Sequence, residues 1–362
     1  MGNDKNIKIL IIGAGDFPIY ETALYNAFID LGYHNCKLLV WKDFFKRNDL
    51  VMRVSTRTEM RFGCGFQIKN FNNRVVKECE GEKYNIVFLY TCRIVFASTV
   101  KRIREMGIFV ISYCNDDPFS DRYKNYFWRN YRKSLKFCQI NYVYRSQNIM
   151  DVYEECGRRG ELLRAYYIES DNYICNENEL IRETPDVIFL GHIENDERTE
   201  YIKILLDKGI SVGLNEVAYG EWGKNKENVI FLKNPREWYN RYLCSCKIPL
   251  VFLSKLNRDT YTRRCFEIPA AGAFLFCPYT DDLASMFAED EEIVFFRSKK
   301  EFVEKIEYYL TNDYVRERIA SAGHDRLLKD KHEIKDRVKQ IINDYCMTLQ
   351  KIEEKNKGGA CQ

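Results

Sequence analysis

Two acidic residues, Asp259 and Glu267, lie eight positions apart where a charged stretch of the chain becomes apolar. The segment NRDTYTRRCFEIPAAGAFLF covers residues 257–276, and Glu267 stands between a phenylalanine and an isoleucine. A carboxylate buried among apolar side chains is costly unless a hydrogen bond or an opposite charge compensates it. Arg263, one helical turn earlier, could form an i,i+4 ion pair with Glu267. A bound ligand could do the same, and the residues alone leave both alternatives open.

A second acidic pair, Asp116 and Asp117, belongs to the segment NDDPF at 115–119. It follows the apolar run IFVISY at 108–113, which we predict to be a parallel strand. Side chains at the carboxyl end of such a strand lie where open α/β sheets bind ligands. An Asp-Asp-Pro sequence also makes an ordinary turn, so a functional and a structural interpretation both stand.

The segment GAGD at 13–16 follows the predicted strand at 7–12 and precedes a predicted helix. Gly13 and Gly15 suit a phosphate or a close backbone approach, and we keep them as candidate binding residues. The full G-x-G-x-x-G pattern is absent because position 18 is proline. We therefore favour a tight strand-to-helix turn over a site for NAD.

Apolar strands and amphipathic helices alternate along two halves of the chain, which is the pattern of doubly wound parallel sheets. In the first half we predict strands at 7–12, 36–41, 84–90, 108–113 and 138–144, with helices at 19–31, 98–107 and 148–156. In the second half we predict strands at 186–191, 210–214, 228–232, 249–253, 273–277 and 291–296, with helices at 197–208, 262–271, 299–311 and 313–329. Residues 46–80 are polar and are predicted to be irregular.

The alternation of elements also predicts the domains. One Rossmann-like domain covers 1–170, the polar segment 171–185 is a linker, and a second Rossmann-like domain covers 186–332. A C-terminal helix is predicted at 333–355 and a disordered tail at 356–362.

Composition excludes several classes of protein. The net charge of +3 is too small to indicate a nucleic-acid binder. The 14 cysteines include no CxxC pair, which favours reduced thiols in a cytoplasmic protein. The four histidines have no metal-ligand spacing, so no metal is predicted. The N-terminus resembles no signal sequence, and no apolar run approaches the roughly 18 residues of a membrane helix. At most, peripheral association with a membrane is expected.

The segment 257–272 resembles the C-terminal signature of the CgeB-like glycosyltransferases, which are relatives of the group 1 glycosyltransferases. The runs RERIASAGHDRLL, IFLGHIENDERTEYIKILLDKGI and AYGEWG resemble other elements of that family. NDDPF and YRSQNIMDVYEECG do so in the first half, and the resemblance covers most of residues 84–330.

This resemblance implies the GT-B fold, an α/β architecture of two Rossmann-like, doubly wound domains facing a central cleft. It implies that the domain at 1–170 is the acceptor side and that the domain at 186–332 binds the donor. It also implies a hexosyltransferase-like enzyme that moves a sugar from a nucleoside-diphosphate sugar to a hydroxyl acceptor on a glycan, a surface polysaccharide or a protein. No cofactor and no metal would be needed. In retaining relatives an acid, seven residues and then a glutamate bind the donor. By that pattern Glu267 would hold the ribose and Asp259 would face the donor sugar. The first acid is Asp here where Glu is usual, so retention or inversion stays open.

Charge and position suggest the remaining members of the site. A guanidinium offers a planar fork of donors that matches phosphate oxygens. The candidates for the diphosphate are Arg198, Arg258, Arg263 and Arg264, and Gly191 and Thr262 complete the donor-binding set. Asp117 or Asp116 would be the base or would contact the acceptor.

Two other functions remain compatible with the sequence. One is a non-catalytic structural or spore-surface protein that keeps the fold, because a fold alone does not imply chemistry. The other is a nucleotide-dependent oxidoreductase, against which the broken glycine pattern counts.

Overall fold

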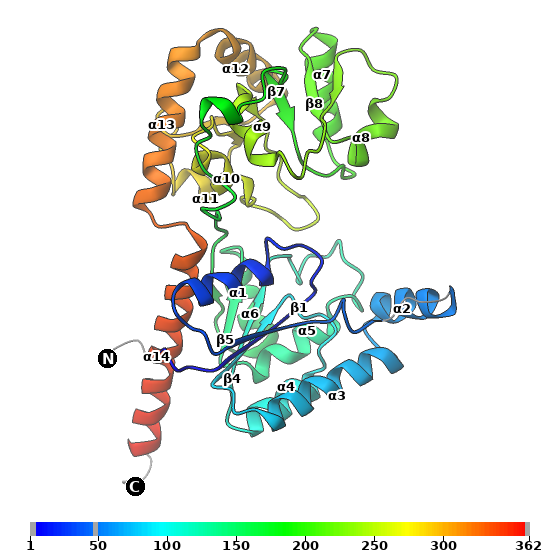
Figure 1. Ribbon diagram of the computed structural model, residues 1–362, viewed down its shortest axis with the longest axis vertical. Coiled ribbons are helices and arrows are strands. Elements are labelled where there is room, and N and C mark those ends of the chain that lie inside the picture. Colours follow the sequence, from blue (N-terminus) through cyan, green and yellow to red (C-terminus); the bar gives the residue numbers. More distant parts are fainter. Residues whose placement is uncertain (1–4, 46–49, 359–362) are drawn as a thin grey trace. The chain divides into compact units, whose positions relative to one another are not determined.

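The chain divides into two compact units, each with its own parallel sheet (Figure 1). The computed structural model describes residues 5–45 and 50–358. Unit 1 comprises Met1–Arg164 and Ile334–Gln362, and unit 2 comprises Ala165–Glu333. The predicted C-terminal helix at 333–355 is therefore part of unit 1. It continues to Gly358, into the tail predicted at 356–362, of which residues 359–362 lie outside the described residues.

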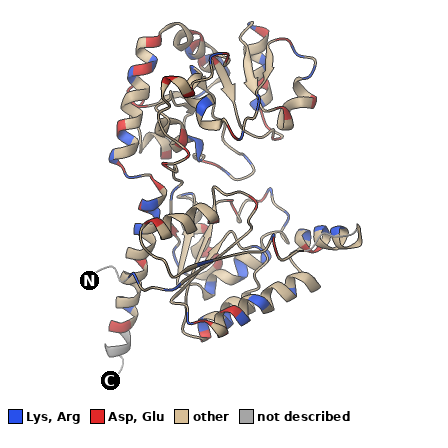
Figure 2. Cartoon of the chain, in the orientation of Figure 1, with Lys and Arg blue, Asp and Glu red and all other residues tan. Residues whose placement is uncertain are grey.

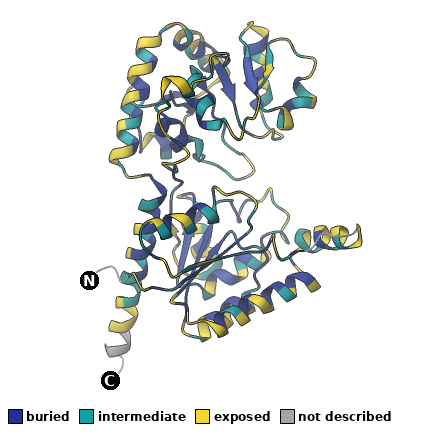
Figure 3. Cartoon of the chain, viewed as in Figure 1, coloured by how far each residue is buried: buried dark blue, intermediate teal, exposed yellow. Residues whose placement is uncertain are grey.

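The sheet of unit 1 has six parallel strands in the order β2-β1-β3-β4-β5-β6. Their bounds are β1 (Ile9–Gly13), β2 (Cys36–Val40), β3 (Ile86–Tyr90), β4 (Phe109–Cys114), β5 (Ile140–Val143) and β6 (Glu161–Leu162). Every residue of β1, β3, β4 and β5 is buried, as expected for parallel strands covered on both faces by helices (Figure 3).

The helices of unit 1 come from both ends of the chain. They are α1 (Glu21–Asp30), α2 (Leu50–Phe62), α3 (Phe66–Gly81), α4 (Ala97–Glu105), α5 (Arg129–Ser134), α6 (Asn148–Cys156) and α14 (Ile334–Gly358), with a 3₁₀ turn at Leu135–Phe137. Helix α14 packs against α1. Helix α6 ends, as predicted, at Gly157 in the left-handed conformation with φ of 72°.

The prediction of irregular structure at 46–80 is wrong for the described part of that range, which forms α2 and α3. Residues 46–49 lie outside the described residues. In α3, Ile68, Phe71, Val75 and Cys79 recur every three or four positions and are buried. Three asparagines hide this period because asparagine is a poor helix former. One of them, Asn72, is itself buried and donates to the carbonyl oxygens of two residues, at 2.8 and 3.0 Å.

Unit 2 contains a four-stranded parallel sheet in the order β10-β7-β8-β9 and a parallel pair, β11-β12. A parallel bridge between Leu250 and Phe276 joins β10 to β11. The strands are β7 (Val187–Phe189), β8 (Val212–Leu214), β9 (Val229–Phe231), β10 (Ile248–Pro249), β11 (Phe276–Pro278) and β12 (Val294–Phe296). The strands thus run as one parallel array, β9-β8-β7-β10-β11-β12.

Helices cover this array and bury a second apolar core. They are α7 (Arg198–Asp207), α8 (Glu216–Gly223), α9 (Tyr239–Ser245), α10 (Arg264–Ala270), α11 (Asp281–Ala284), α12 (Lys299–Thr311) and α13 (Asp313–Lys329), with a 3₁₀ turn at Glu177–Glu179. None of the helices in the described part of the chain combines the length and the apolar character needed to cross a lipid bilayer.

Candidate functional site

The strand order of unit 2 reverses between β7 and β10. Parallel sheets bind ligands at such a switch point, beyond the carboxyl ends of the two strands. The loop after β7 contains Gly191 and leads to Arg198 at the start of α7. The segment after β10 contains Arg258 and Asp259 and leads to α10. The fold therefore brings the segments with the residues predicted to bind the sugar donor to the carboxyl ends of two neighbouring strands.

Glu267 is buried in α10 and is bonded by its own chain. Its Oε1 lies 2.7 Å from Nε of Arg263, one turn earlier. Its Oε2 accepts a hydrogen bond of 2.7 Å from the hydroxyl of Tyr239, at the start of α9. The ion pair that the sequence left as an alternative is thus present. Burial, and the charge of Glu267, raise the pKa of Tyr239 well above its usual value.

Tyr239 is a site residue that the sequence did not indicate. It is 28 positions from Glu267 and is one of 25 tyrosines, with nothing in its neighbours that marks it. Only the packing of α9 beside α10 reveals the contact.

The neighbouring arginines 263 and 264 differ in their surroundings. Arg263 pairs with Glu267, and its guanidinium lies 5.0 Å from the ring centre of Tyr166. Arg264 is half-buried, donates to the Leu190 carbonyl at 3.3 Å and lies 5.8 Å from the ring centre of Phe189. Its Nε is buried without a hydrogen-bond partner, and Arg264 forms no ion pair with any residue that the structure describes. At the switch point Arg264 is therefore a cation without a carboxylate partner among the described residues.

Arg198, in contrast, has its charge compensated within the loop after β7. It is 4% exposed. Its Nε and Nη2 donate to both carboxylate oxygens of Asp196 at 2.6–3.0 Å, and Nη2 lies 3.2 Å from Glu194. Its Nη1 donates to the His192 carbonyl at 2.6 Å. These contacts fix the path of residues 192–198.

The AYGEWG motif supports the same loop. Tyr219 in α8 is buried, and its hydroxyl donates to the His192 carbonyl at 3.2 Å. Gly191 has no room for a side chain, because a Cβ there would lie 2.2 Å from the Phe189 ring. The motif and the glycine thus hold the backbone at the end of β7 in one position.

The pKa of His192, in the loop after β7, depends on the charged groups around it. Partial burial and the positive charge of Arg264 lower the pKa of its imidazole, with smaller effects of Arg198 and Arg236. Glu194 acts in the opposite direction. Arg264 therefore places positive charge near the imidazole at the end of β7.

The segment after β10 is held by Asp259. Its Oδ2 accepts from the Ser254 N–H at 3.2 Å, and its own N–H donates to the Ser254 carbonyl at 2.9 Å. Ser254 in turn donates through Oγ to Glu194 at 2.9 Å, which links the segments after β7 and β10. Arg258 adopts a left-handed φ of 47° at this turn. The carbonyl of Thr262 accepts from the N–H of Cys265 at 3.0 Å, just before α10.

In unit 1 the two acids of NDDPF have different environments. Asp117 is fully buried and accepts from the Asn148 side chain at 2.9 Å and the Phe119 N–H at 3.1 Å. It stabilises the turn. Asp116 is half-buried, and its charge acts on Arg93, which follows β3. Of the pair, Asp116 is the more exposed.

The turn after β1 carries its own anion. The N–H of Gly15 donates to Oε1 of Glu21, which is buried at the start of α1. A Cβ on Gly13 would lie 2.5–2.8 Å from the Glu21 side chain. Burial raises the pKa of this carboxyl. The carboxylate occupies the space that a phosphate would need, which supports the tight-turn alternative for Gly13 and Gly15.

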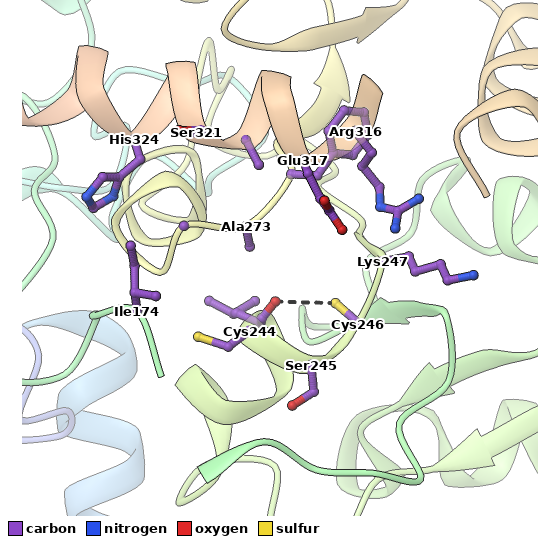
Figure 4. A pocket seen from close by; sticks show the side chains of 14 residues that line it. Ile174, Cys244, Ser245, Cys246, Lys247, Ala273, Arg316, Glu317, Ser321 and His324 are labelled. Atoms are coloured by element: carbon purple, nitrogen blue, oxygen red, sulfur yellow. Dashed lines mark hydrogen bonds between the residues drawn. The ribbon is translucent and has the colours of Figure 1, made fainter. Parts of the chain in front are cut away.

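A separate hollow of about 380 Å³ lies between α9 and α13 in unit 2 (Figure 4). Its two cations have protein partners. Lys247 lies 3.7 Å from Asp186, and Arg316 pairs with Asp313 at 2.8 Å. None of the predicted site residues lines it. Among the residues that the structure describes, no three His, Cys, Asp or Glu side chains are grouped to hold a metal ion.

Comparisons with known proteins agree with this architecture. Residues 204–343 match the model of a family described as glycosyl transferase-like. No curated protein matches the chain.

Solved structures similar to this chain include three GT-B proteins. Sucrose-phosphate synthase from Thermosynechococcus elongatus has a TM-score of 0.66 at 10% identity, over 98% of this chain and 100% of that one. A glycosyltransferase from Rickettsia africae ESF-5 has a TM-score of 0.66 at 9% identity, over 95% and 99%. HepE from Anabaena, in complex with UDP and glucose, has a TM-score of 0.63 at 9% identity, over 94% and 100%.

The predicted GT-B fold is confirmed by these likenesses. The predicted class of enzyme, a glycosyltransferase, is supported by the family model together with this fold.

Proposed function

We propose that this protein transfers a sugar from a nucleoside-diphosphate sugar, bound by unit 2, to a hydroxyl acceptor bound by unit 1. The observation that carries the proposal is Arg264, whose charge is uncompensated at the switch point beside His192. A half-buried guanidinium without a carboxylate partner is costly in the free protein, and a diphosphate would compensate it. We also propose that the protein is a CgeB-like glycosyltransferase and that it is located in the cytoplasm.

The charge needed by the leaving group would come from the protein. The departing nucleoside diphosphate gains negative charge in the transition state, and positioned cations stabilise it. Arg264 supplies that cation, and the network of Arg198 keeps the adjacent loop in place. We therefore propose that no metal takes part.

The carboxylates would orient the donor. Each oxygen of Glu267 accepts one protein donor, and a carboxylate oxygen has capacity for a second. Glu267 can thus accept the ribose hydroxyls without releasing Arg263 or Tyr239. Asp259 would face the donor sugar, and Asp116 would contact the acceptor hydroxyl of a glycan, a polysaccharide or a protein.

Two adjacent substitutions test the donor site. With UDP-glucose as the probe, chosen because a structure of HepE contains it, Arg264→Gln should weaken binding by about tenfold or more. The melting temperature of the ligand-free variant should not fall, because an uncompensated charge is removed. Arg263→Gln is the matched control. It breaks the pair with Glu267 and should lower stability by about 3–5 kcal/mol.

Calorimetric titration and thermal melting of both variants give these results directly. Equal affinity of the wild type and Arg264→Gln for the nucleotide sugar would refute the diphosphate role. A panel of UDP, GDP, CDP and dTDP sugars identifies the base, and saturation at about 100 times the dissociation constant should add about 2.7 kcal/mol of stability. This gain should persist in excess EDTA. A donor that binds but never releases nucleoside diphosphate would favour the non-catalytic alternative.

A further inference from the structure

Helix α2 carries apolar side chains that the protein leaves in solvent. Leu50 and Val51 are 76% and 77% exposed, and Val54 and Phe62 are also exposed. Phe66, at the start of α3, is 75% exposed. At 100° per residue, Leu50, Val51, Val54 and Phe62 fall within one arc of about 120° on the helix. Apolar side chains gathered on one exposed face mark an interaction surface, whereas scattered ones need no explanation.

The same face is basic. Arg53, Arg57 and Arg61 are exposed at intervals of four residues, so on a helix their arc adjoins the apolar arc. Figure 2 shows basic residues along α2. Between residues 50 and 66 the sequence contains one acid, Glu59. Glu59 points to the protein side, where it accepts from the Ser55 hydroxyl at 3.2 Å and the Ile68 N–H at 3.1 Å. The exposed side of α2 therefore combines positive charge and apolar surface.

The opposite side of α2 fixes the helix to unit 1. Thr56 is buried and donates to the Gln67 side chain at 3.2 Å. The Met60 carbonyl accepts from Arg93. At the border of the exposed face, the rings of Phe62 and Tyr126 lie 5.1 Å apart. The exposed face is thus preformed, and binding to it would not require the helix to fold.

We propose that this face, formed by Leu50, Val51, Arg53, Val54, Arg57, Arg61, Phe62 and Phe66, binds an anionic lipid surface. Charge complementarity selects this occupant. Arginines beside apolar side chains on one helix suit the interface of a bilayer, where the guanidinium groups meet lipid phosphates and the apolar groups enter the acyl boundary. A neutral apolar partner would offer no anion to Arg57 and Arg61, and a soluble polyanion would leave Leu50 and Val51 in water.

Vesicle flotation with the full chain tests the proposal. The wild type should bind vesicles of phosphatidylcholine with added phosphatidylglycerol and should not bind pure phosphatidylcholine. The combined variant Arg53→Gln, Arg57→Gln and Arg61→Gln should lose about fivefold in partitioning per arginine, or about a hundredfold. The combined variant Leu50→Ser, Val51→Ser and Val54→Ser should also lose binding. The matched control, Lys101→Gln, Lys300→Gln and Lys339→Gln, removes three exposed positive charges elsewhere and should bind as the wild type does.

Four flotation results would overturn the proposal. They are no binding to anionic vesicles, equal loss in the lysine control, undiminished binding of the arginine variant, and undiminished binding of the serine variant, which would reduce the effect to net charge. Light scattering tests whether the face instead binds a second copy of the chain. If the wild type is a dimer and the serine variant is a monomer, the face is an interface between copies. UDP-glucose binding, measured on the same variants, should be unchanged in all of them and shows that they are folded. The failure of lipid binding would leave the donor proposal intact.

Discussion

At the scale of single residues, the buried carboxylate of Glu267 has both a structural partner and a proposed ligand. Glu267→Gln removes the charge that compensates Arg263, so the free energy of unfolding should fall by about 3 kcal/mol or more in urea titrations of the ligand-free protein. The affinity for a nucleotide sugar should also fall by about tenfold or more, since charge-assisted bonds to ribose are weakened. Because the two residues form one pair, Glu267→Gln combined with Arg263→Gln should destabilise less than the sum of the single changes.

The two readouts separate the roles of Glu267. A loss of stability with unchanged affinity would make it a structural residue only. A loss of affinity with unchanged stability would mean that the pair with Arg263 contributes little.

His192 gives the donor site an expected pH dependence. In the free protein its pKa is lowered by partial burial and by Arg264, Arg198 and Arg236, against the effect of Glu194. A bound diphosphate adds negative charge beside the imidazole and raises that pKa, so binding is coupled to proton uptake. Affinity for UDP-glucose should rise as the pH falls through the pKa of the complex and level off below that of the free protein.

The diphosphate of UDP-glucose has no proton that titrates near neutrality, so a pH series of calorimetric titrations isolates the histidine. His192→Gln should remove the dependence between about pH 5 and 8. An unchanged pH profile in His192→Gln would place the diphosphate away from this loop.

At the scale of elements, Gly323 sets how closely α13 approaches the backbone before β12. A Cβ at Gly323 would lie 2.4 Å from the backbone oxygen of Glu292, which cannot rotate away. Gly323→Ala should therefore lower stability by about 1–3 kcal/mol despite the better helix propensity of alanine.

Gly220→Ala, inside α8, is the comparison for Gly323→Ala. Its Cβ would meet only the flexible side chain of Glu216, at 3.3 Å. It should change stability little or raise it by up to about 1 kcal/mol. Equal effects of the two changes in urea unfolding would contradict the close approach of α13.

Periodic segments with a clear end signal were predictable from the sequence. Helices α6, α12 and α13 have the predicted bounds, because apolar spacing and a terminal glycine or polar residue mark them. Helices α2 and α3 were missed for opposite reasons. The apolar period of α3 is interrupted by asparagines. In α2, arginines, threonines and a serine separate the apolar residues, so the segment was interpreted as polar and irregular.

The position of the candidate site followed from the sequence, but the roles of its residues did not. The sequence grouped Asp259, Glu267 and Gly191 only through the family resemblance, and the strand order brings the segments that contain them to the carboxyl end of one sheet. The sequence does not show whether Arg263 or Arg264 pairs with the carboxylate. The pairing depends on how α10 is rotated about its axis. The ion-pair partner of Arg198 was likewise not predictable from the sequence. Asp196, two positions away, compensates a charge that the spacing left available for a ligand.

At the scale of the whole molecule, the C-terminal helix α14 belongs to the core of the N-terminal unit. Ile341 is fully buried there, and the ring of Tyr345 packs edge-on against Phe109 of β4, 4.9 Å between centres. Ile341→Ala should cost about 2–5 kcal/mol through the cavity it leaves. Hydrogen exchange should show lost protection in the strands of unit 1, with those of unit 2 unchanged.

Ile319→Ala in α13 is the matched change, since Ile319 is buried in the core of unit 2. Ile319→Ala should reduce hydrogen-exchange protection in the strands of unit 2 and leave those of unit 1 unchanged. Lost protection in β7–β12 on Ile341→Ala would contradict the assignment of α14 to unit 1.

The return of α14 to unit 1 also has a consequence for biosynthesis. Unit 2 is one continuous stretch, Ala165–Glu333, so all its strands and helices leave the ribosome before α14 does. Chains grow at about 5–20 residues per second, and domains begin to fold as they emerge. During the synthesis of unit 2, the nascent unit 1 exposes the apolar groups that α14 later covers, Phe109 among them. The half of the protein that is translated first is thus the half that is completed last, and a chaperone acting on this chain would find its binding surface there.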